Sequence, residues 1–206
     1  MAQVGFSVGQ DNNGWKLKKQ QDGISVYSRE VAGSRFKEIK VTVNIQTSLS
    51  GIIALFKDVP AYPLWVYLCE KPETVKQGSE TEDYYYSETA APWPVSNRDV
   101  VVYSRIRQDP DTKVVTSKSK NVTGIVPEKK GIVRIPMLKS LWTLIPKGNG
   151  RVDVSYELIV DPGGWIPAWL VNMTMAVGPY NTILNMREEL KKEKYQSAKY
   201  TCIKEL

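Results

Sequence analysis

The last long segment of the chain, residues 166–194, most constrains the fold, because it reads as a helix whose first half is almost entirely apolar. A helix of that kind has to lie against a large apolar surface. The segments before it alternate apolar and polar residues, the period of two expected of half-buried strands. In residues 150–160, for example, Val152, Val154 and Tyr156 share one face. The pattern predicts an α+β fold, with a curved antiparallel sheet wrapped around a long C-terminal helix.

The alternation places eight strands, and two helices interrupt or follow them. The expected strands are residues 22–31, 36–46, 66–76, 82–90, 98–108, 113–122, 130–145 and 150–160. Residues 48–57 change to helical spacing, with Ser48 as the expected N-cap. In the final helix, Gly178-Pro179 should kink the helix or divide it in two, because proline removes a helical hydrogen bond.

The composition argues against several kinds of chemistry. The 206 residues suit one domain and include no histidine, the usual general base near neutral pH and the commonest metal ligand. Cys69 and Cys202 form no motif; we expect two buried or free thiols, and a disulfide between them stays open. We therefore expect no zinc site, no haem, no other cofactor and no enzymatic activity.

The sequence as given does not decide where in the cell the protein acts. No apolar run approaches the ~20 residues needed to span a bilayer, and no signal peptide is present. The localisation stays unknown: a soluble cytoplasmic protein as given, or a periplasmic one if a signal peptide has been removed.

The net charge of +6 is unevenly distributed. Residues 113–147 hold eight lysines and arginines against a single acid, Glu128. We call this segment the basic belt. It can favour an anionic membrane surface or nucleic acid, or it can be a solvated strand face, and both interpretations stay open.

Two inward strand faces carry small hydroxyl groups where a packed core would have larger apolar residues. Val102 and Ser104 share a face in residues 98–108, and Ser117 lies on such a face in residues 113–122. Because voids destabilise a core, these serines predict a lined cavity, although they could instead be buried and bonded to the backbone. Met173 on the final helix would line such a cavity adaptably, or pack as an ordinary core methionine.

A turn and a helix start lie side by side in DPGGWIPAWLVN, residues 161–172. Pro162-Gly163-Gly164 can reverse the chain sharply, and Pro167 suits the first turn of a helix. This joint would let the final helix act as a gate over the cavity.

Three motifs in register resemble the START (StAR-related lipid-transfer) family. They are Trp15 followed by DGISVYSR at residues 22–29, PWPVSNRD at residues 92–99, and DPGGWIPAWLVN. The resemblance covers residues 15–195, with residues 1–14 as an N-terminal segment and residues 196–206 as a C-terminal tail. It implies a helix-grip fold with one lipid in an internal tunnel, and non-vesicular lipid transfer or lipid sensing rather than catalysis.

The resemblance also implies roles for individual residues. Trp93 and Trp165 match membrane-inserting tryptophans of a ceramide-transferring member and would form a gate that contacts the membrane, unless both simply pack in the core. Tyr156 matches a ceramide-contacting tyrosine. Glu88 matches a buried acid of sterol carriers, whose arginine partner falls at Ser104 here. An unpaired Glu88 facing the cavity would have a raised pKa.

The full set of expected ligand-binding residues combines this resemblance with strand parity. The set is Tyr86, Glu88, Val102, Ser104, Ser117, Tyr156, Trp169, Met173 and Val177. The neighbours Arg98 and Asp99 are expected to fix a strand start by a salt bridge.

The lipid class is not predicted. Tyr62, Pro63 and Val66 replace the charged residues by which a relative reads phosphatidylcholine, and Ser87 and Ser117 replace polar contacts to ceramide.

Two other functions remain as alternatives. Polyketide cyclases and aromatases share the helix-grip fold, and Glu88 with Tyr86 or Tyr156 would have to supply the acid–base chemistry. Nucleic-acid binding through the basic belt lacks a recognition helix or an RNA-type aromatic signature, so no nucleic-acid partner is expected.

Overall fold

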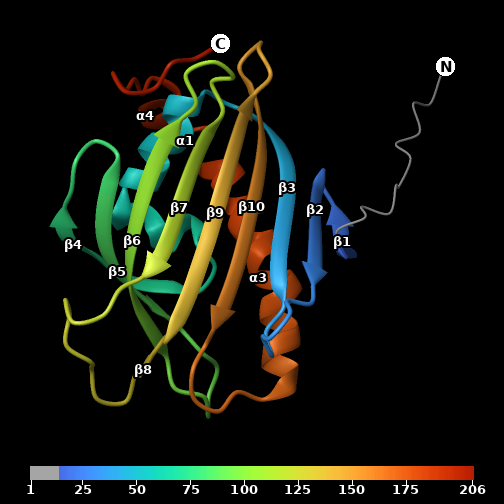
Figure 1. The fold of residues 1–206 in the computed structure, drawn as a ribbon, viewed down its shortest axis with the longest axis vertical. Coiled ribbons are helices and arrows are strands. Elements are labelled where there is room, and N and C mark those ends of the chain that lie inside the picture. Colours follow the sequence, from blue (N-terminus) through green and yellow to red (C-terminus); the bar gives the residue numbers. More distant parts are fainter. Residues whose placement is uncertain (1–13) are drawn as a thin grey trace.

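One antiparallel sheet dominates the molecule (Figure 1). The computed structural model describes residues 14–206, except for the side chains of Gln77, residues 168–174 and Ala176. The strands lie in the order β1-β2-β3-β10-β9-β7-β6-β5-β4, and the short β8 pairs with β6 in parallel. Their bounds are β1 Lys16–Gln21, β2 Ile24–Arg29, β3 Glu38–Gln46, β4 Cys69–Gln77, β5 Glu82–Thr89, β6 Arg98–Gln108, β7 Val115–Asn121, β8 Val133–Arg134, β9 Met137–Pro146 and β10 Arg151–Asp161.

The helices lie against one face of this sheet. They are α1 Leu49–Lys57, the 3-10 turn η1 Val59–Ala61, α2 Tyr62–Trp65, α3 Ala168–Glu189 and α4 Glu193–Gln196. Figure 1 shows the sheet curving in front of the long α3, as the apolar C-terminal segment predicted. The expected cap of α1 is confirmed, because the Ser48 hydroxyl accepts a hydrogen bond from the Gly51 amide at 3.0 Å.

The structure corrects three details of the predicted elements. The first strand, β1, was not expected. The predicted strand at residues 130–145 is two strands, with Pro136 between β8 and β9. A division of the last helix at Gly178-Pro179 is wrong, because α3 runs through Pro179 without interruption.

The tightly packed core occupies the part of the molecule where α1 meets the second half of α3. Ile52 and Ile53 of α1, Ile183 and Met186 of α3, and the C-cap residue Leu190 are almost completely buried. The helix α3 contacts α2 and the strands β2 and β3, and these buried side chains anchor its C-terminal half in the core. The N-terminal half of α3 is therefore the part that remains available to cover a cavity.

The last residues of the chain complete this core. Tyr195 and Ile203 are buried in it, and both thiols, Cys69 and Cys202, are free. The Glu205 carboxylate accepts hydrogen bonds from the Leu49 and Ser50 amides at 3.0 and 2.8 Å, so it caps the N-terminus of α1.

The two outer strands are irregular. The pairing of β1 with β2 shifts register between Leu17 and Lys19. The pairing of β4 with β5 shifts twice, and β4 contains Pro72. Both outer strands also carry several lysines.

Candidate functional site

A cavity of about 570 Å³ lies between the concave face of the sheet and the helices α2 and α3. Its volume falls within the range typical of small-molecule sites, about 300–1,000 Å³. Strands β3, β5, β6, β7, β9 and β10 all contribute side chains to its wall. The helix α3 contributes Met175, Gly178, Pro179 and Thr182.

Aromatic side chains form a large part of the wall. The Trp142 and Tyr156 rings stack with their centroids 3.9 Å apart, and the Tyr62 and Tyr85 rings meet edge-on at 5.1 Å. Burial raises the pKa of Tyr156 and of Tyr85 above the ordinary tyrosine value. These phenols therefore stay protonated, and they offer a ligand neutral hydrogen-bonding groups rather than charge.

A ladder of serine hydroxyls crosses the wall from β6 to β7. The Ser104 hydroxyl lies 3.2 Å from that of Ser117, and the Ser119 hydroxyl donates to Ser104 at 3.0 Å. All three residues line the cavity, as does Ser140 of β9. Ser104, Ser117 and Ser119 thus bond to one another rather than to the backbone. Strand parity puts Ser119 on the same face as Ser117, although only Ser104 and Ser117 are in the expected set, and Ser140 is a cavity residue that the sequence did not indicate.

Of the other expected site residues, Val102 and Tyr156 line the cavity and Val177 does not. Trp169 and Met173 belong to α3, but their side chains lie outside the part that the structure describes.

Tyr86 and Glu88 are not in the cavity wall, which corrects their expected placement. Tyr85, Ser87 and Thr89 line the cavity, so the alternation of β5 directs Tyr86 and Glu88 to the opposite face. The Tyr86 ring packs there beneath the Lys129 ammonium group, 3.9 Å from the ring centroid.

The environment of Glu88 is that of a paired carboxylate. It accepts hydrogen bonds from Asn97 at 2.8 Å and from Lys71 at 3.2 Å. The hydrogen bond from Asn97, together with Lys71, lowers the pKa of Glu88 below its ordinary value. The raised pKa expected of an unpaired Glu88 in the cavity is therefore not found, because Glu88 is paired and lies outside the cavity. Arg105, which follows the expected partner position at Ser104, pairs with Glu82 rather than with Glu88, at 3.4 Å.

The neighbours Arg98 and Asp99 do not form the expected salt bridge with each other. Asp99 receives two hydrogen bonds from Arg134, at 2.7 and 3.1 Å, on the outer side of β6. Arg98 points to the cavity and lines it. Successive residues of a strand face opposite sides, which separates the two charges.

Two exposed tryptophans flank one end of the cavity. Trp93 is 92% exposed and Trp165 is 73% exposed, so neither packs in the core. Their loops contribute Ala90 and Ala91, and Pro162 and Ile166, to the cavity wall. In the second loop Gly163 and Gly164 have φ angles of +66° and +59°, which favour glycine.

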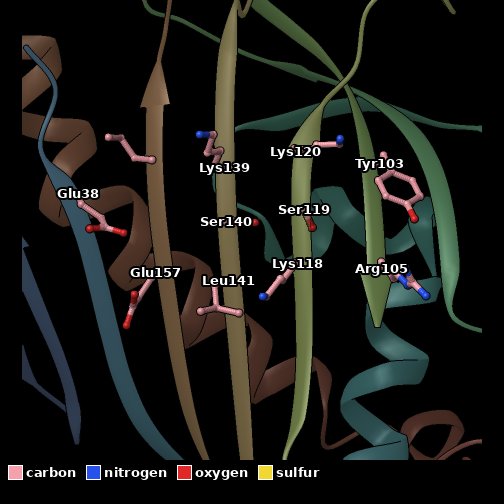
Figure 2. Close-up of a pocket in the computed structure, with 11 residues that line it drawn as sticks. Glu38, Tyr103, Arg105, Lys118, Ser119, Lys120, Lys139, Ser140, Leu141 and Glu157 are labelled. Atoms are coloured by element: carbon pink, nitrogen blue, oxygen red, sulfur yellow. The ribbon is translucent and has the colours of Figure 1, made fainter. Parts of the chain in front are cut away.

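A shallow depression of about 480 Å³ lies on the other, convex face of the sheet. Figure 2 shows Lys118 and Lys120 of β7 beside Lys139 of β9, with Glu157 on the neighbouring strand. The basic belt thus places part of its charge on this outer face, away from the cavity.

The residues that the structure describes match neither the pattern of a metal site nor that of a membrane-spanning helix. No group of three or more histidine, cysteine or acidic residues within residues 14–206 is arranged to hold a metal ion. No helix in the same part of the chain is long and apolar enough to cross a membrane.

Comparison with known proteins identifies the family. The family model described as START domain matches residues 7–195. The chain belongs to the START domain family. This START domain is 35% identical over 178 residues to an uncharacterized protein, PA1579, of Pseudomonas aeruginosa, covering 86% of this chain and 87% of that one. It is 27% identical over 163 residues to the phosphatidylcholine transfer protein of Rattus norvegicus, covering 77% and 75%.

Solved structures agree with the fold. A fragment of the STAR-related lipid transfer protein from Xanthomonas axonopodis superposes with a TM-score of 0.80 at 36% identity, covering 87% of this START domain and 100% of that chain. Human STARD10 superposes with a TM-score of 0.75 at 20% identity, covering 87% and 74%, and this likeness concerns the fold alone.

Proposed function

We propose that this START domain binds one lipid, or another largely apolar ligand, in the cavity between the sheet and α3, and carries or senses it. The observation that carries the proposal is the cavity itself, about 570 Å³ in volume and walled by apolar, aromatic and hydroxyl groups. The related phosphatidylcholine transfer protein supports it. Binding fits this wall better than catalysis, because the candidate acid Glu88 is ion-paired outside the cavity.

The direct test is native mass spectrometry of the purified protein, followed by lipid extraction. We expect a co-purified lipid at one molecule per chain. Two adjacent positions in β9 provide a matched pair, because successive side chains of a strand face opposite sides. Ser140 borders the outer depression but also lines the cavity, so Ser140→Phe fills the cavity, whereas Leu141 lines only the outer depression and Leu141→Phe leaves the cavity open (Figure 2). Ser140→Phe should lose the lipid and Leu141→Phe should keep it. Equal lipid content in both variants, or no bound lipid of any kind in the unmodified protein, would contradict the proposal.

We further propose that Trp93 and Trp165 contact the membrane during lipid exchange. Their exposure and their position at one end of the cavity support this role, because tryptophan prefers the interface between apolar chains and headgroups. Replacing both by alanine should weaken association with liposomes and slow transfer between them. Leu17→Ala, which removes an exposed apolar residue from the distant strand β1, serves as the control. Unchanged transfer in the double variant would refute the role.

A further inference from the structure

Arg98 is a buried cation in the wall of the cavity. It is the first residue of β6, is only 6% exposed, and lines the cavity together with Ala90, Ala91 and Ile166. These neighbours belong to the two loops that carry the exposed tryptophans. Arg98 therefore lies at the end of the cavity that is bordered by the two tryptophan loops. A polar group of a ligand at this end would be close to Arg98.

Among the residues that the structure describes, no carboxylate forms an ion pair with Arg98. The nearby Asp99 is engaged by Arg134, and Glu88 is engaged by Lys71 and Asn97. The one acid in the described cavity wall, Asp83, pairs with Lys57 at 2.9 Å. Burial without a counter-charge lowers the pKa of Arg98, which shows how poorly its charge is compensated.

The hydrogen bonds of Arg98 leave donors free. One terminal nitrogen, Nη1, donates to the Ser96 carbonyl at 2.5 Å, and Nη2 donates to the Trp165 carbonyl at 3.1 Å. The third nitrogen, Nε, is buried and has no partner. A guanidinium group carries five N–H donors, and its fork matches the two oxygens of a carboxylate or a phosphate. Each terminal nitrogen carries a second N–H group that no described residue accepts, and the two oxygens of a ligand's anionic group would satisfy these donors.

The rest of the wall determines what else such a ligand contains. Below Arg98 the wall is formed by apolar and aromatic groups and by neutral serine hydroxyls, such as Val100, Val102 and Ser104. The site therefore suits a molecule with one anionic group and a long apolar part.

We propose that the ligand is an anionic lipid whose carboxylate or phosphate monoester is bound by Arg98, with its hydrocarbon part in the cavity. This inference rests on the proposed function and names the class of lipid. A free phosphate ion shares the headgroup chemistry, so the test has to separate the headgroup from the tail.

The test compares ligands that share one hydrocarbon chain, by calorimetry or native mass spectrometry on the delipidated full chain. The probes are hexadecanoate, hexadecanol, hexadecyl phosphate, hexadecylphosphocholine and inorganic phosphate. We expect hexadecanoate to bind about tenfold or more tightly than hexadecanol, and hexadecyl phosphate to bind more tightly than hexadecylphosphocholine. Inorganic phosphate should bind weakly, because it gains nothing from the cavity.

Two variants assign the preference to Arg98. Arg98→Met keeps most of the side-chain volume and should bind hexadecanoate and hexadecanol about equally. Arg105→Met, which removes an exposed arginine from the outer face of the sheet, should keep the preference. If Arg98→Met does not fold, the comparison of ligands on the unmodified protein still decides for or against an anionic headgroup.

The outcomes separate the two proposals. Equal binding of hexadecanoate and hexadecanol, or a preference that survives in folded Arg98→Met, would overturn the role of Arg98 and leave lipid binding intact. If inorganic phosphate bound as tightly as hexadecyl phosphate, the site would be one for a free anion. That result would overturn the proposal of a lipid ligand. Failure of every long-chain probe to bind would remove the proposed function, and this inference with it.

Discussion

Arg98 and Asp99 are adjacent in β6, yet their charges lie in different environments. Arg98 faces the cavity, whereas Asp99 and Arg134 form a pair on the other side whose side chains are 1% and 11% exposed. The Asp99 carboxylate raises the pKa of Arg134. Arg134 also donates to the Val126 and Pro127 carbonyls, so this pair holds the loop before β8 against β6.

Removing one partner of this pair should destabilise the protein strongly. Asp99→Asn leaves the Arg134 charge buried without its partner, and we expect the free energy of unfolding to fall by about 3 kcal/mol. Urea denaturation measures this change. Glu188→Gln, which breaks the exposed pair with Lys191, should change the free energy of unfolding far less, because solvent screens that pair. Equal effects of the two substitutions would show that burial does not matter here.

Glu88 should make the stability of the protein depend on pH in the acid range. Its pKa in the folded state is lowered by Asn97 and Lys71, so its contribution is fully present above the unfolded-state value of about 4.3. That contribution is lost as the pH falls through the lower, folded-state pKa. Denaturation curves between pH 7 and pH 3 should therefore show a smaller acid loss in Glu88→Gln than in the unmodified protein. An unchanged acid profile would contradict the pairing.

At the level of elements, the joint between β10 and α3 depends on two glycines. Gly163 adopts a positive φ, and its amide donates a hydrogen bond to the Asp161 carboxylate at 2.9 Å. This hydrogen bond fixes the backbone of Gly163 in that conformation. A Cβ atom at Gly163 would also come within 3.0 Å of the Pro136 ring. The joint is therefore both strained for other residues and closely packed against the segment between β8 and β9.

Gly163→Ala should destabilise the protein by more than a comparable substitution in open space. Gly124 has a similar φ of +77° with no atom near its Cβ position, so Gly124→Ala measures the backbone cost alone, about 1 kcal/mol. We expect Gly163→Ala to exceed that cost, as measured by thermal unfolding. Identical melting temperatures for the two variants would show that the contact with Pro136 is easily relieved.

Alternation predicted most elements because the sheet is covered on one face. Val152 and Val154 of β10 and Ser104 and Ser117 of the cavity wall follow directly from the period of two. The prediction failed in β5, where three consecutive tyrosines, Tyr84 to Tyr86, leave no apolar–polar contrast to set the parity. Parity could therefore not decide the face of Glu88, which the family resemblance suggested as a site residue, and Tyr86 and Glu88 lie outside the cavity wall.

Arg98 shows a different kind of failure. The sequence places an acid next to it, which favoured a local salt bridge, although strand geometry sends neighbouring side chains apart. Arg134, the true partner of Asp99, is 35 positions away in the sequence. Only the pairing of β6 with β8 brings it close.

For the whole molecule, the cavity makes stability depend on the ligand. A ligand that binds only the folded state adds about 2.7 kcal/mol at a hundred times its dissociation constant. Adding back the co-purified lipid to delipidated protein should therefore raise the melting temperature by several degrees, roughly 2–4 °C for each kcal/mol. Ser140→Phe should show no such rise, and Leu141→Phe should show it in full. A rise of equal size in both would place the lipid outside the cavity.

The irregular outer strands have a consequence for the solubility of the protein at high concentration. An open sheet has unpaired backbone N–H and C=O groups along its two edge strands, here β1 and β4. A regular edge strand can form hydrogen bonds with the edge strand of a second molecule. Here β1 carries a register shift and three lysines, and β4 carries two shifts, Pro72 and further lysines. These features oppose edge-to-edge association and strand exchange. The protein can thus expose two tryptophans and still resist aggregation through its sheet.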